Sequence, residues 1–438
     1  MSSFATTFNE KILPVIMKFV SMKGVVALKD GILYTLPLTL VGSVFLLLAQ
    51  LPYQPLNDWL AATLGAGWTD PLWKAFGATF NVIALIATIG IGYTYAKNEG
   101  HEPLSAGVIS FVVFLLTTSS TVIAPKSGEV VGDVIPIAWA GGKGMVTAII
   151  IGLVVGAVYS LFMSRNITIK MPAGVPQGVA NSFAALIPAA VIILGATIVY
   201  SGFKWGLQTT LIEWIYKVLQ TPLQGMTDSL GGVIVIGFLI PFLWWFGVHG
   251  ASIVGGVMSG ILASNTLDNQ AIINSGKELT IANGAHIVTQ QFVDQFMTVT
   301  GSGMTIGLVI CMLFFSKSAQ SKQLGRLSIL PGIFNINEPV TFGTPIVMNP
   351  FMAVPFILTP VVSGLITYFA IGTGLVPPFS AVSVPWTTPA PISGLLVGGV
   401  RTALLQIVVL VISFFIYLPF FKKQDNINYK NEQEAQNS

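Results

Sequence analysis

A carboxylate next to two amides is the group in this sequence best suited to chemistry. Glu338 is the sole acid between Asp294 and Asp425, and Asn335 and Asn337 come just before it. A carboxylate and two amides supply paired hydrogen-bond acceptors and donors, which suit vicinal hydroxyls. No cluster of cations stands beside them to hold a phosphorylated or carboxylated molecule. The residue types therefore predict a binding site for a neutral polyol such as a sugar.

Histidine and tryptophan extend this prediction. His249 follows the apolar run PFLWWFGV and titrates near neutral pH, so it could orient a hydroxyl or take its proton. The alternative is a buried histidine bonded to a backbone carbonyl. Trp245 and Trp386 could offer flat faces to sugar rings. The alternative for these two tryptophans is an anchor at a membrane interface.

Other kinds of site are not indicated. No group of His, Cys, Asp and Glu has the spacing of metal ligands, and neither a G-x-S-x-G elbow nor a G-x4-G-K-[ST] phosphate loop is present. We therefore expect no metal and no cofactor.

The composition limits the class of protein that carries these residues. Of the 438 residues 53% are hydrophobic and 8% are charged, whereas a soluble chain has roughly 25% Asp, Glu, Lys and Arg. So little charge cannot cover a water-facing surface, which excludes a soluble enzyme, a disordered chain and a nucleic-acid binder.

The apolar residues come in blocks of the length that crosses a bilayer as a helix. The sequence predicts an all-α polytopic membrane protein, a single domain over residues 1–438 with about ten transmembrane helices. The candidate spans lie near residues 31–50, 76–96, 104–124, 145–163, 184–203, 231–248, 250–265, 301–316, 350–372 and 395–421. Residues 1–30 are expected to be a cytoplasmic segment and 424–438 a disordered cytoplasmic tail. Trp205 to Gln220 has apolar residues near helical spacing and predicts an amphipathic helix in the interface.

Two proline-rich stretches do not fit simple helices. Ser328 to Pro350 contains four prolines, and Leu375 to Ser393 is also rich in proline. Broken backbone at membrane depth persists only inside protein or along a cavity, so both stretches predict re-entrant loops, and transporters build their sites on such segments. Asn265 to Thr300, polar and glycine-bearing, is another candidate. A charge at membrane depth is costly, which makes Glu338 a functional hypothesis; the alternative is a loop-tip carboxylate that reaches water.

The distribution of Lys and Arg predicts the orientation. Thirteen of the twenty lie in one set of alternate loops and six in the other, while Arg401 lies inside the last span. Cytoplasmic loops keep the excess of cations, which places both termini in the cytoplasm if the number of spans is even.

The loop around Glu338 carries a resemblance to a known family. LPGIFNINEPVTFGTPIVMNP, from Leu330 to Pro350, resembles the signature of the membrane-embedded IIC permease of the bacterial sugar phosphotransferase system (PTS), in its lactose/cellobiose/N,N'-diacetylchitobiose family. The GVHG at 247–250 and the preceding WWF extend the likeness over nearly the whole chain.

The resemblance implies a homodimer in the bacterial cell membrane that takes up a β-linked disaccharide, diacetylchitobiose or cellobiose. The sugar 6-hydroxyl would then be phosphorylated by the phosphocysteine of a separate IIB protein. This chain would carry no phosphoryl group, and Cys311 would not be the phosphorylated cysteine. By matching position, Glu338 and His249 would bind the sugar near the reacting hydroxyl. Four further residues would surround it: Asn335, Asn337, Trp245 and Trp386.

Two rival functions remain at this point. A proton-coupled secondary sugar transporter would use Glu338 and His249 as a proton relay. A channel fits less well, because the candidate site has no repeated ring of like groups around a pore.

Overall fold

The computed structural model describes residues 13–49, 54–124, 128–247, 249–344, 346–347 and 349–437. The first half contains α2 (Leu13–Val20), α3 (Lys23–Ile32), η2 (Leu33–Thr35), α4 (Leu36–Ala49), α5 (Gln54–Leu64), α6 (Asp70–Phe80), α7 (Ile83–Asn98), α8 (Pro103–Leu116), a hairpin of β1 (Val122–Ile123) and β2 (Val130–Val131), α9 (Ile137–Ala140), η3 (Gly142–Gly144), α10 (Met145–Ser164), α11 (Gln177–Ala184) and α12 (Leu186–Gly202). The second half contains η4 (Phe203–Leu207), α13 (Leu211–Ile215), η5 (Tyr216–Gln220), α14 (Thr221–Thr227), α15 (Leu230–Trp245), α16 (Gly250–Asn274), η6 (Ile281–Asn283), α17 (Gln290–Phe292), η7 (Val293–Met297), α18 (Ile306–Phe315), α19 (Ala319–Ile333), α20 (Glu338–Gly343), α21 (Pro350–Gly372) and α22 (Ile392–Asn437).

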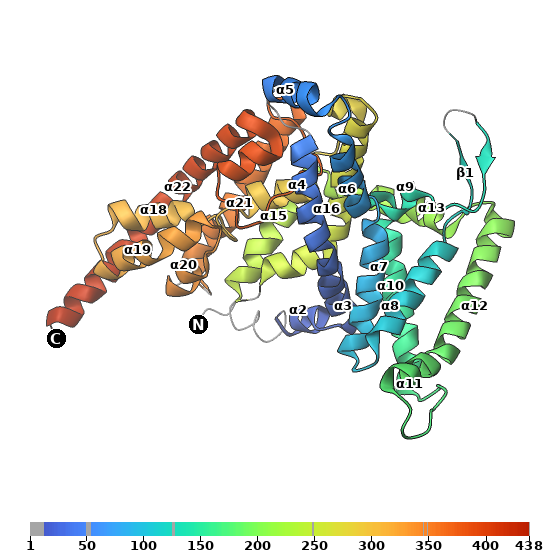
Figure 1. Cartoon of the computed structure of the whole chain (residues 1–438). Coiled ribbons are helices and arrows are strands. Elements are labelled where there is room, and N and C mark those ends of the chain that lie inside the picture. Colours follow the sequence, from blue (N-terminus) through green and yellow to red (C-terminus); the bar gives the residue numbers. More distant parts are fainter. Residues whose placement is uncertain are drawn as a thin grey trace.

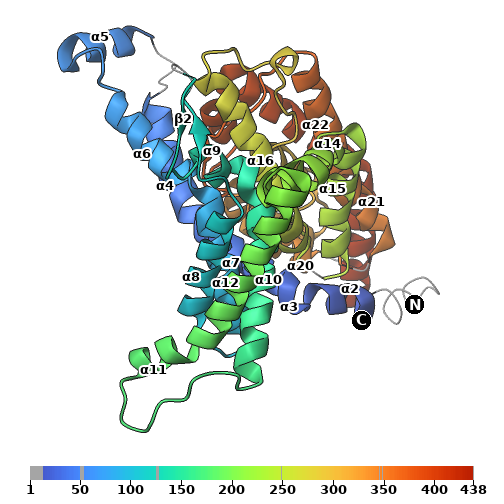
Figure 2. The ribbon, with the colours of Figure 1, turned by 90° about the vertical axis from the view of Figure 1, so that its right-hand side faces the viewer.

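The helices form two groups with a shared middle. On one side α7 packs on α10, α8 and α3, with α12 beyond them, and on the other side α18 packs on α19 and α22 (Figure 1). Between the groups, α16 contacts both α3 and α15. In both ribbon views α2 and the end of α22 lie in the lower part of the molecule, and α5 and the β-hairpin lie in its upper part (Figures 1 and 2).

The chain is an all-α protein with membrane-spanning helices, as predicted, but the count of ten is not confirmed. Among the described residues, seven helices are long and apolar enough to cross a membrane. The pair Leu211–Thr227 and Leu230–Trp245 would add an eighth, bent by 74°. Two shorter apolar helices, Pro103–Leu116 and Ile306–Phe315, account for further predicted spans.

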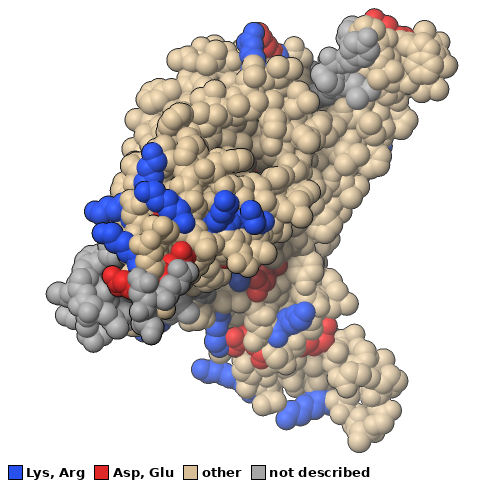
Figure 3. All heavy atoms as spheres, turned by 90° about the vertical axis from the view of Figure 1, so that its left-hand side faces the viewer, with Lys and Arg blue, Asp and Glu red and all other residues tan. Residues whose placement is uncertain are grey.

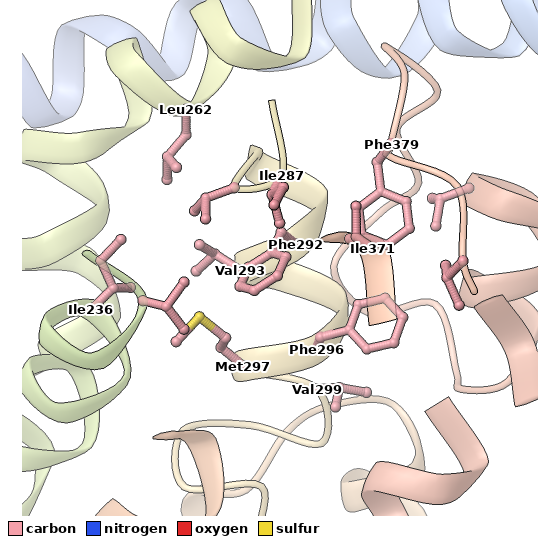
Figure 4. Packing of buried hydrophobic residues seen from close by; sticks show 14 of the residues in the cluster. Ile236, Leu262, Ile287, Phe292, Val293, Phe296, Met297, Val299, Ile371 and Phe379 are labelled. Atoms are coloured by element: carbon pink, nitrogen blue, oxygen red, sulfur yellow. The ribbon is translucent and has the colours of Figure 1, made fainter. Parts of the chain in front are cut away.

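Close packing and a shared apolar core hold the groups together. A Cβ at Gly152 of α10 would lie 2.8 Å from Cβ of Ile91 in α7, so only glycine allows these helices their separation. In the centre, Phe292 and Phe296 lie among side chains from α15, α16 and α21 (Figure 4). The ring of Phe296 stacks on Phe379 at 5.5 Å, which fixes the loop after α21 to η7.

The structure corrects the two ends of the chain. The first candidate span begins at Lys23 and not near residue 31, so residues 23–30 belong to a helix of the bundle; residues 1–12 lie outside the described part. The tail over 424–437 is helical and not disordered, since α22 runs to Asn437. Its carboxylates explain this: Asp425 accepts a hydrogen bond from Lys317 N (2.6 Å) and Glu432 accepts one from Gln320 N (2.9 Å), which caps α19.

Two predicted segments also differ in detail. The helix expected over 205–220 begins only at Leu211, because Gln208 takes a left-handed conformation (φ 51°) that ends η4. The stretch 265–300 is helical to Asn274 and irregular beyond it, with short turns of helix at 281–283 and 290–297.

Candidate functional site

The two amides beside Glu338 hold backbone from distant parts of the chain. Asn335 is 5% exposed, and its Nδ2 donates to the carbonyls of Trp386 (2.5 Å) and Thr388 (3.1 Å). Its Oδ1 accepts from Thr300 N at 2.6 Å. Asn337 is equally buried and donates from Nδ2 to Ser302 O at 2.6 Å. The two side chains therefore join the two proline-rich loops and the end of the 275–305 stretch.

Asn335 also shapes the turn before Glu338. Its φ is 66°, in the left-handed region where asparagine is among the residues tolerated best. This turn ends α19 and lets the chain start α20, whose first residue is Glu338 followed by a proline at the second position. Glu338 is exposed, and among the described residues its carboxylate makes no hydrogen bond or ion pair.

Trp244 connects the His249 turn to α20. Its ring packs against the imidazole of His249 (centroids 4.7 Å apart) and against Phe342 in α20 (6.0 Å). Trp245, the residue singled out from the sequence, is buried and donates from Nε1 to Asn349 O at 2.9 Å. Trp245 therefore anchors the segment before α21. Trp244, which was not predicted as a site residue, is the tryptophan that packs between His249 and the helix that carries Glu338.

The hydrogen bonds of His249 determine which ring nitrogen carries the proton. His249 caps α16, and its Nδ1 accepts from the backbone N–H of Ser252 at 3.1 Å. A backbone N–H can only donate, so Nδ1 is unprotonated and the neutral ring carries its proton on Nε2. The imidazole is exposed and so presents an N–H donor to a ligand.

A cavity of about 490 Å³, whose largely apolar wall carries a few polar and charged side chains, lies beside the His249 turn. Its walls come from α3, α4, α16, the 290–294 segment and the loop before α22. Its lining includes the polar or aromatic residues Lys29, Asp30, Ser252, Gln290, Asp294 and Trp386. The volume falls in the range of small-molecule sites. Trp386 is 57% exposed, so its indole is free to meet a ligand.

The six residues predicted from the sequence occupy different places relative to this cavity. Trp386 lines it, and His249 touches its wall because Ser252 Oγ lies 2.9 Å from His249 Nδ1. Glu338 is outside the lining, on the neighbouring exposed surface of α20. Asn335, Asn337 and Trp245 bind backbone groups and so position the others.

Several cavity residues were not predicted from the sequence. Lys29 and Asp30, which form an ion pair at 3.3 Å, had been assigned to a terminal cytoplasmic segment. Asp294 lies in the stretch that polarity had marked as a third broken segment, and its Oδ1 accepts from Gln290 Nε2 at 2.9 Å. For Lys29 and Asp30, the signal in the sequence was the presence of charges in an otherwise apolar helix.

A helical membrane bundle with a cavity that carries a few polar groups at broken segments is typical of a transporter of small solutes. The Phosphotransferase system EIIC family model matches residues 29–360, and the chain belongs to this family.

Full-length relatives agree with the family match. The chain is 40% identical over 442 residues to the putative permease IIC component YwbA of Bacillus subtilis, covering 100% of this chain and 98% of the relative. It is 40% identical to the cellobiose-specific EIIC component of Geobacillus stearothermophilus, covering 99% and 97%. The crystal structure of the transporter ChbC, the IIC component of the N,N'-diacetylchitobiose-specific phosphotransferase system, matches with a TM-score of 0.92 at 39% identity, over 97% of this chain and 99% of that one.

Proposed function

We propose that this chain binds a β-linked disaccharide of the cellobiose or diacetylchitobiose type in the 490 Å³ cavity and moves it across the bacterial cell membrane. The observation that carries the proposal is the cavity itself, which a half-exposed tryptophan lines and the His249 cap adjoins. An indole face packs on the C–H face of a sugar ring. The names of the cellobiose-specific, lichenan and oligo-beta-mannoside relatives support a β-linked substrate.

The reacting hydroxyl would lie between His249 and Glu338. The proton on Nε2 makes His249 a donor that orients the sugar oxygen, and the unpaired carboxylate of Glu338 is the acceptor that takes the hydroxyl proton. Trp244 supports this pairing, since it packs on both the His249 ring and α20. The same geometry argues against a relay in which His249 is the base.

The phosphoryl group would come from the phosphocysteine of a IIB protein. The sugar 6-oxygen forms the new bond to phosphorus, the phosphorus–sulfur bond breaks, the hydroxyl proton passes to Glu338, and the cysteine leaves as a thiolate. Cys311 is buried in α18 and is not placed for this role. The product carries about two negative charges, which water solvates, and once Glu338 has passed its proton to water its carboxylate repels them; both effects favour release into the cytoplasm.

Placement in the membrane follows from the charges and the ribbon. We propose that both termini are cytoplasmic, because the loops with most cations predict it. Helix α2 and the end of α22 lie at the same end of the molecule, the lower one in both ribbon views, which supports a common side (Figures 1 and 2). We also propose a homodimer, as the family resemblance implies; cross-linking in vesicles with a mass measurement tests it.

Binding of a panel of β-linked disaccharides to the purified protein tests the substrate. We expect cellobiose or diacetylchitobiose to bind, and Glu338→Ala and His249→Ala to weaken binding. In membrane vesicles, sugar phosphate should accumulate only with IIB and phosphoenolpyruvate. Free sugar accumulating with a proton gradient would instead show the secondary transporter.

A further inference from the structure

The exposed stripe of α19 is charged at its start and apolar at its end, and the apolar end lies next to the turn that carries Glu338. Its first turns expose Lys322 and Arg326, and its last turns expose Leu327 (64%) and Leu330 (65%). The opposite stripe is covered, with Ser321, Gly325 and Ser328 buried against neighbouring helices. We call the exposed residues Lys322, Arg326, Leu327, Leu330, Phe334 and Phe342, with Glu338 among them, the α19 face.

The apolar end of the α19 face is fixed beside the candidate site. A Cβ at Gly343 would lie 2.6 Å from Leu324 Cδ1, so α19 and α20 are in close contact. Phe342, 64% exposed, lies on the same short helix as Glu338 and touches the ring of Trp244. Whatever covers this apolar surface therefore also covers Glu338.

Exposed cations share this side of the molecule with the apolar part, and two acids of α22 bond to the chain at the start of α19. Asp425 is buried and accepts hydrogen bonds from the two residues just before α19, and Glu432 accepts them from the first two residues of α19. Exposed cations remain just before α19, on α19 and on α22, and no salt bridge within the described residues engages them. They are Lys317, Lys322, Arg326, Lys422, Lys423 and Lys430. Lys and Arg side chains gather on the face of the molecule that α19 and α22 present (Figure 3).

A lipid surface does not account for this arrangement. The start of α19 is capped by residues about 6 to 17 Å beyond Phe421, where the continuous apolar run of α22 ends, at 1.5 Å per residue. That distance places Lys322 in water beyond the apolar layer. A carboxylate among the exposed apolar residues would also be costly against acyl chains. An apolar patch with a charged rim is the anatomy of a protein interface.

We propose that the α19 face is the docking surface for the phosphorylated carrier protein. The proposal rests on the proposed function, since the carrier is the IIB protein of that reaction. Its phosphoryl group adds about two negative charges, and Lys322 and Arg326 attract such a surface and steer its approach. The apolar end then seats the carrier over Glu338, where the sugar hydroxyl reacts. In the lactose-specific EIICB relative the match covers 70% of that protein, which leaves room there for a joined carrier.

The test compares two double charge reversals in vesicles supplied with phosphorylated IIB of a cellobiose system. Lys322→Glu with Arg326→Glu is expected to raise KM for phosphorylated IIB about tenfold at low salt, with the difference shrinking at 0.5 M salt. The matched control is Arg165→Glu with Lys170→Glu, two exposed cations on the predicted cytoplasmic side but far from α19. The control should change KM less than twofold.

Further readouts separate the possible failures. The Kd for the disaccharide should stay the same in the α19 variant, because no cavity residue changes. Leu327→Ser with Leu330→Ser should raise the same KM without altering its salt dependence, and it provides a second variant if the charge reversal does not fold. An unchanged KM in both variants with normal sugar binding overturns the docking surface, as does an effect that follows the anionic lipid content and not the IIB concentration. Wild-type protein that binds no sugar overturns the proposed function instead.

Discussion

Two clusters in this protein each contain a histidine and a carboxylate, but they differ in how those groups are paired. In the first, His286 Nδ1 lies 3.0 Å from Asp228 and Nε2 lies 3.6 Å from Asp268. Asp228 also accepts from the backbone of Ile287 (2.8 Å) and Val288 (2.6 Å). Every charged group there has a partner inside the protein.

The second cluster is the candidate site around Glu338 and His249. Its two amides have hydrogen-bond partners inside the protein, whereas its carboxylate and the Nε2 of its histidine have none among the described residues. Asn335 and Asn337 hold backbone, whereas Glu338 is exposed and His249 uses only Nδ1 inside the protein. Residue types alone do not distinguish a structural cluster from a binding site. The unpaired groups of the second cluster support the proposed binding site, and the following experiments test the difference between the two clusters.

The largest effect is expected at Glu338. Glu338→Gln keeps the shape but removes the proton acceptor, so phosphotransfer from IIB should fall at least about 100-fold. The thermal midpoint in detergent should not change, because the carboxylate makes no internal bond. Rates of sugar phosphorylation in vesicles measure this. Transport and phosphotransfer at the wild-type level would show that Glu338 is only a surface carboxylate.

Asp228→Ala should have the opposite effect, lowering stability while leaving sugar binding unchanged. It leaves Nδ1 of His286 and two backbone N–H groups without an acceptor, which should cost about 4 kcal/mol of unfolding free energy. Chemical unfolding in detergent measures the loss, and the Kd for disaccharide of the folded fraction should match wild type. If Glu338→Gln destabilised the protein equally, the distinction between the clusters would fail.

The paired cluster should also make stability depend on pH. Burial lowers the pKa of His286, but hydrogen bonds to Asp228 and Asp268 outweigh it and raise the pKa to about 9. Because the folded pKa exceeds the unfolded value of 6.5, the contribution is complete below pH 6.5 and is lost as pH rises to about 9. We expect a loss of about 3 kcal/mol over that window, measured by unfolding at each pH. His286→Gln should flatten the profile, and an unaltered slope would exclude His286 as its source.

The two amides should differ from each other in stability. Asn335→Ala removes three hydrogen bonds and places alanine at a left-handed φ, whereas Asn337→Ala removes one bond to Ser302. We expect the first to cost about 2 kcal/mol more than the second. Equal unfolding curves for the two variants would mean that Asn335 does not join the loops.

The smallest effect is expected at Trp386. Trp386→Phe keeps an aromatic face but loses area and the indole N–H, so the Kd for disaccharide should rise roughly two- to fivefold. Titration of the purified protein measures it, and Trp205→Phe, at an exposed tryptophan outside the cavity lining, is the control. Equal shifts in both would indicate a general effect of tryptophan loss.

The features that could be predicted from the sequence are those that depend on residues close together in the chain. Scarce charge and long apolar blocks indicated a helical membrane protein, and prolines around Glu338 indicated a broken segment. The same reasoning located the loop from which Asn335 and Asn337 reach out. It could not predict their partners, because the carbonyls of Ser302 and Trp386 lie 35 and 51 residues from them in the chain.

Errors arose where distant contacts override local composition. The polar residues 424–437 resemble a disordered tail until Asp425 and Glu432 are seen to cap α19, more than a hundred residues away. Lys29 was assigned to a loop because positive charges usually lie there. Its helix instead packs on α16, where Lys29 Cγ would lie 2.9 Å from a Cβ at Gly256, and this contact places the ammonium group on the cavity wall.

The amides that hold the loops also bear on how such a protein can change its substrate. Asn335 and Asn337 form their hydrogen bonds with backbone groups, so the framework of the site does not depend on which side chains line the cavity. Lining residues such as Gln290 can then be exchanged without dismantling the loops. Adaptation to a new sugar needs few simultaneous substitutions in such a protein, because each intermediate sequence still folds.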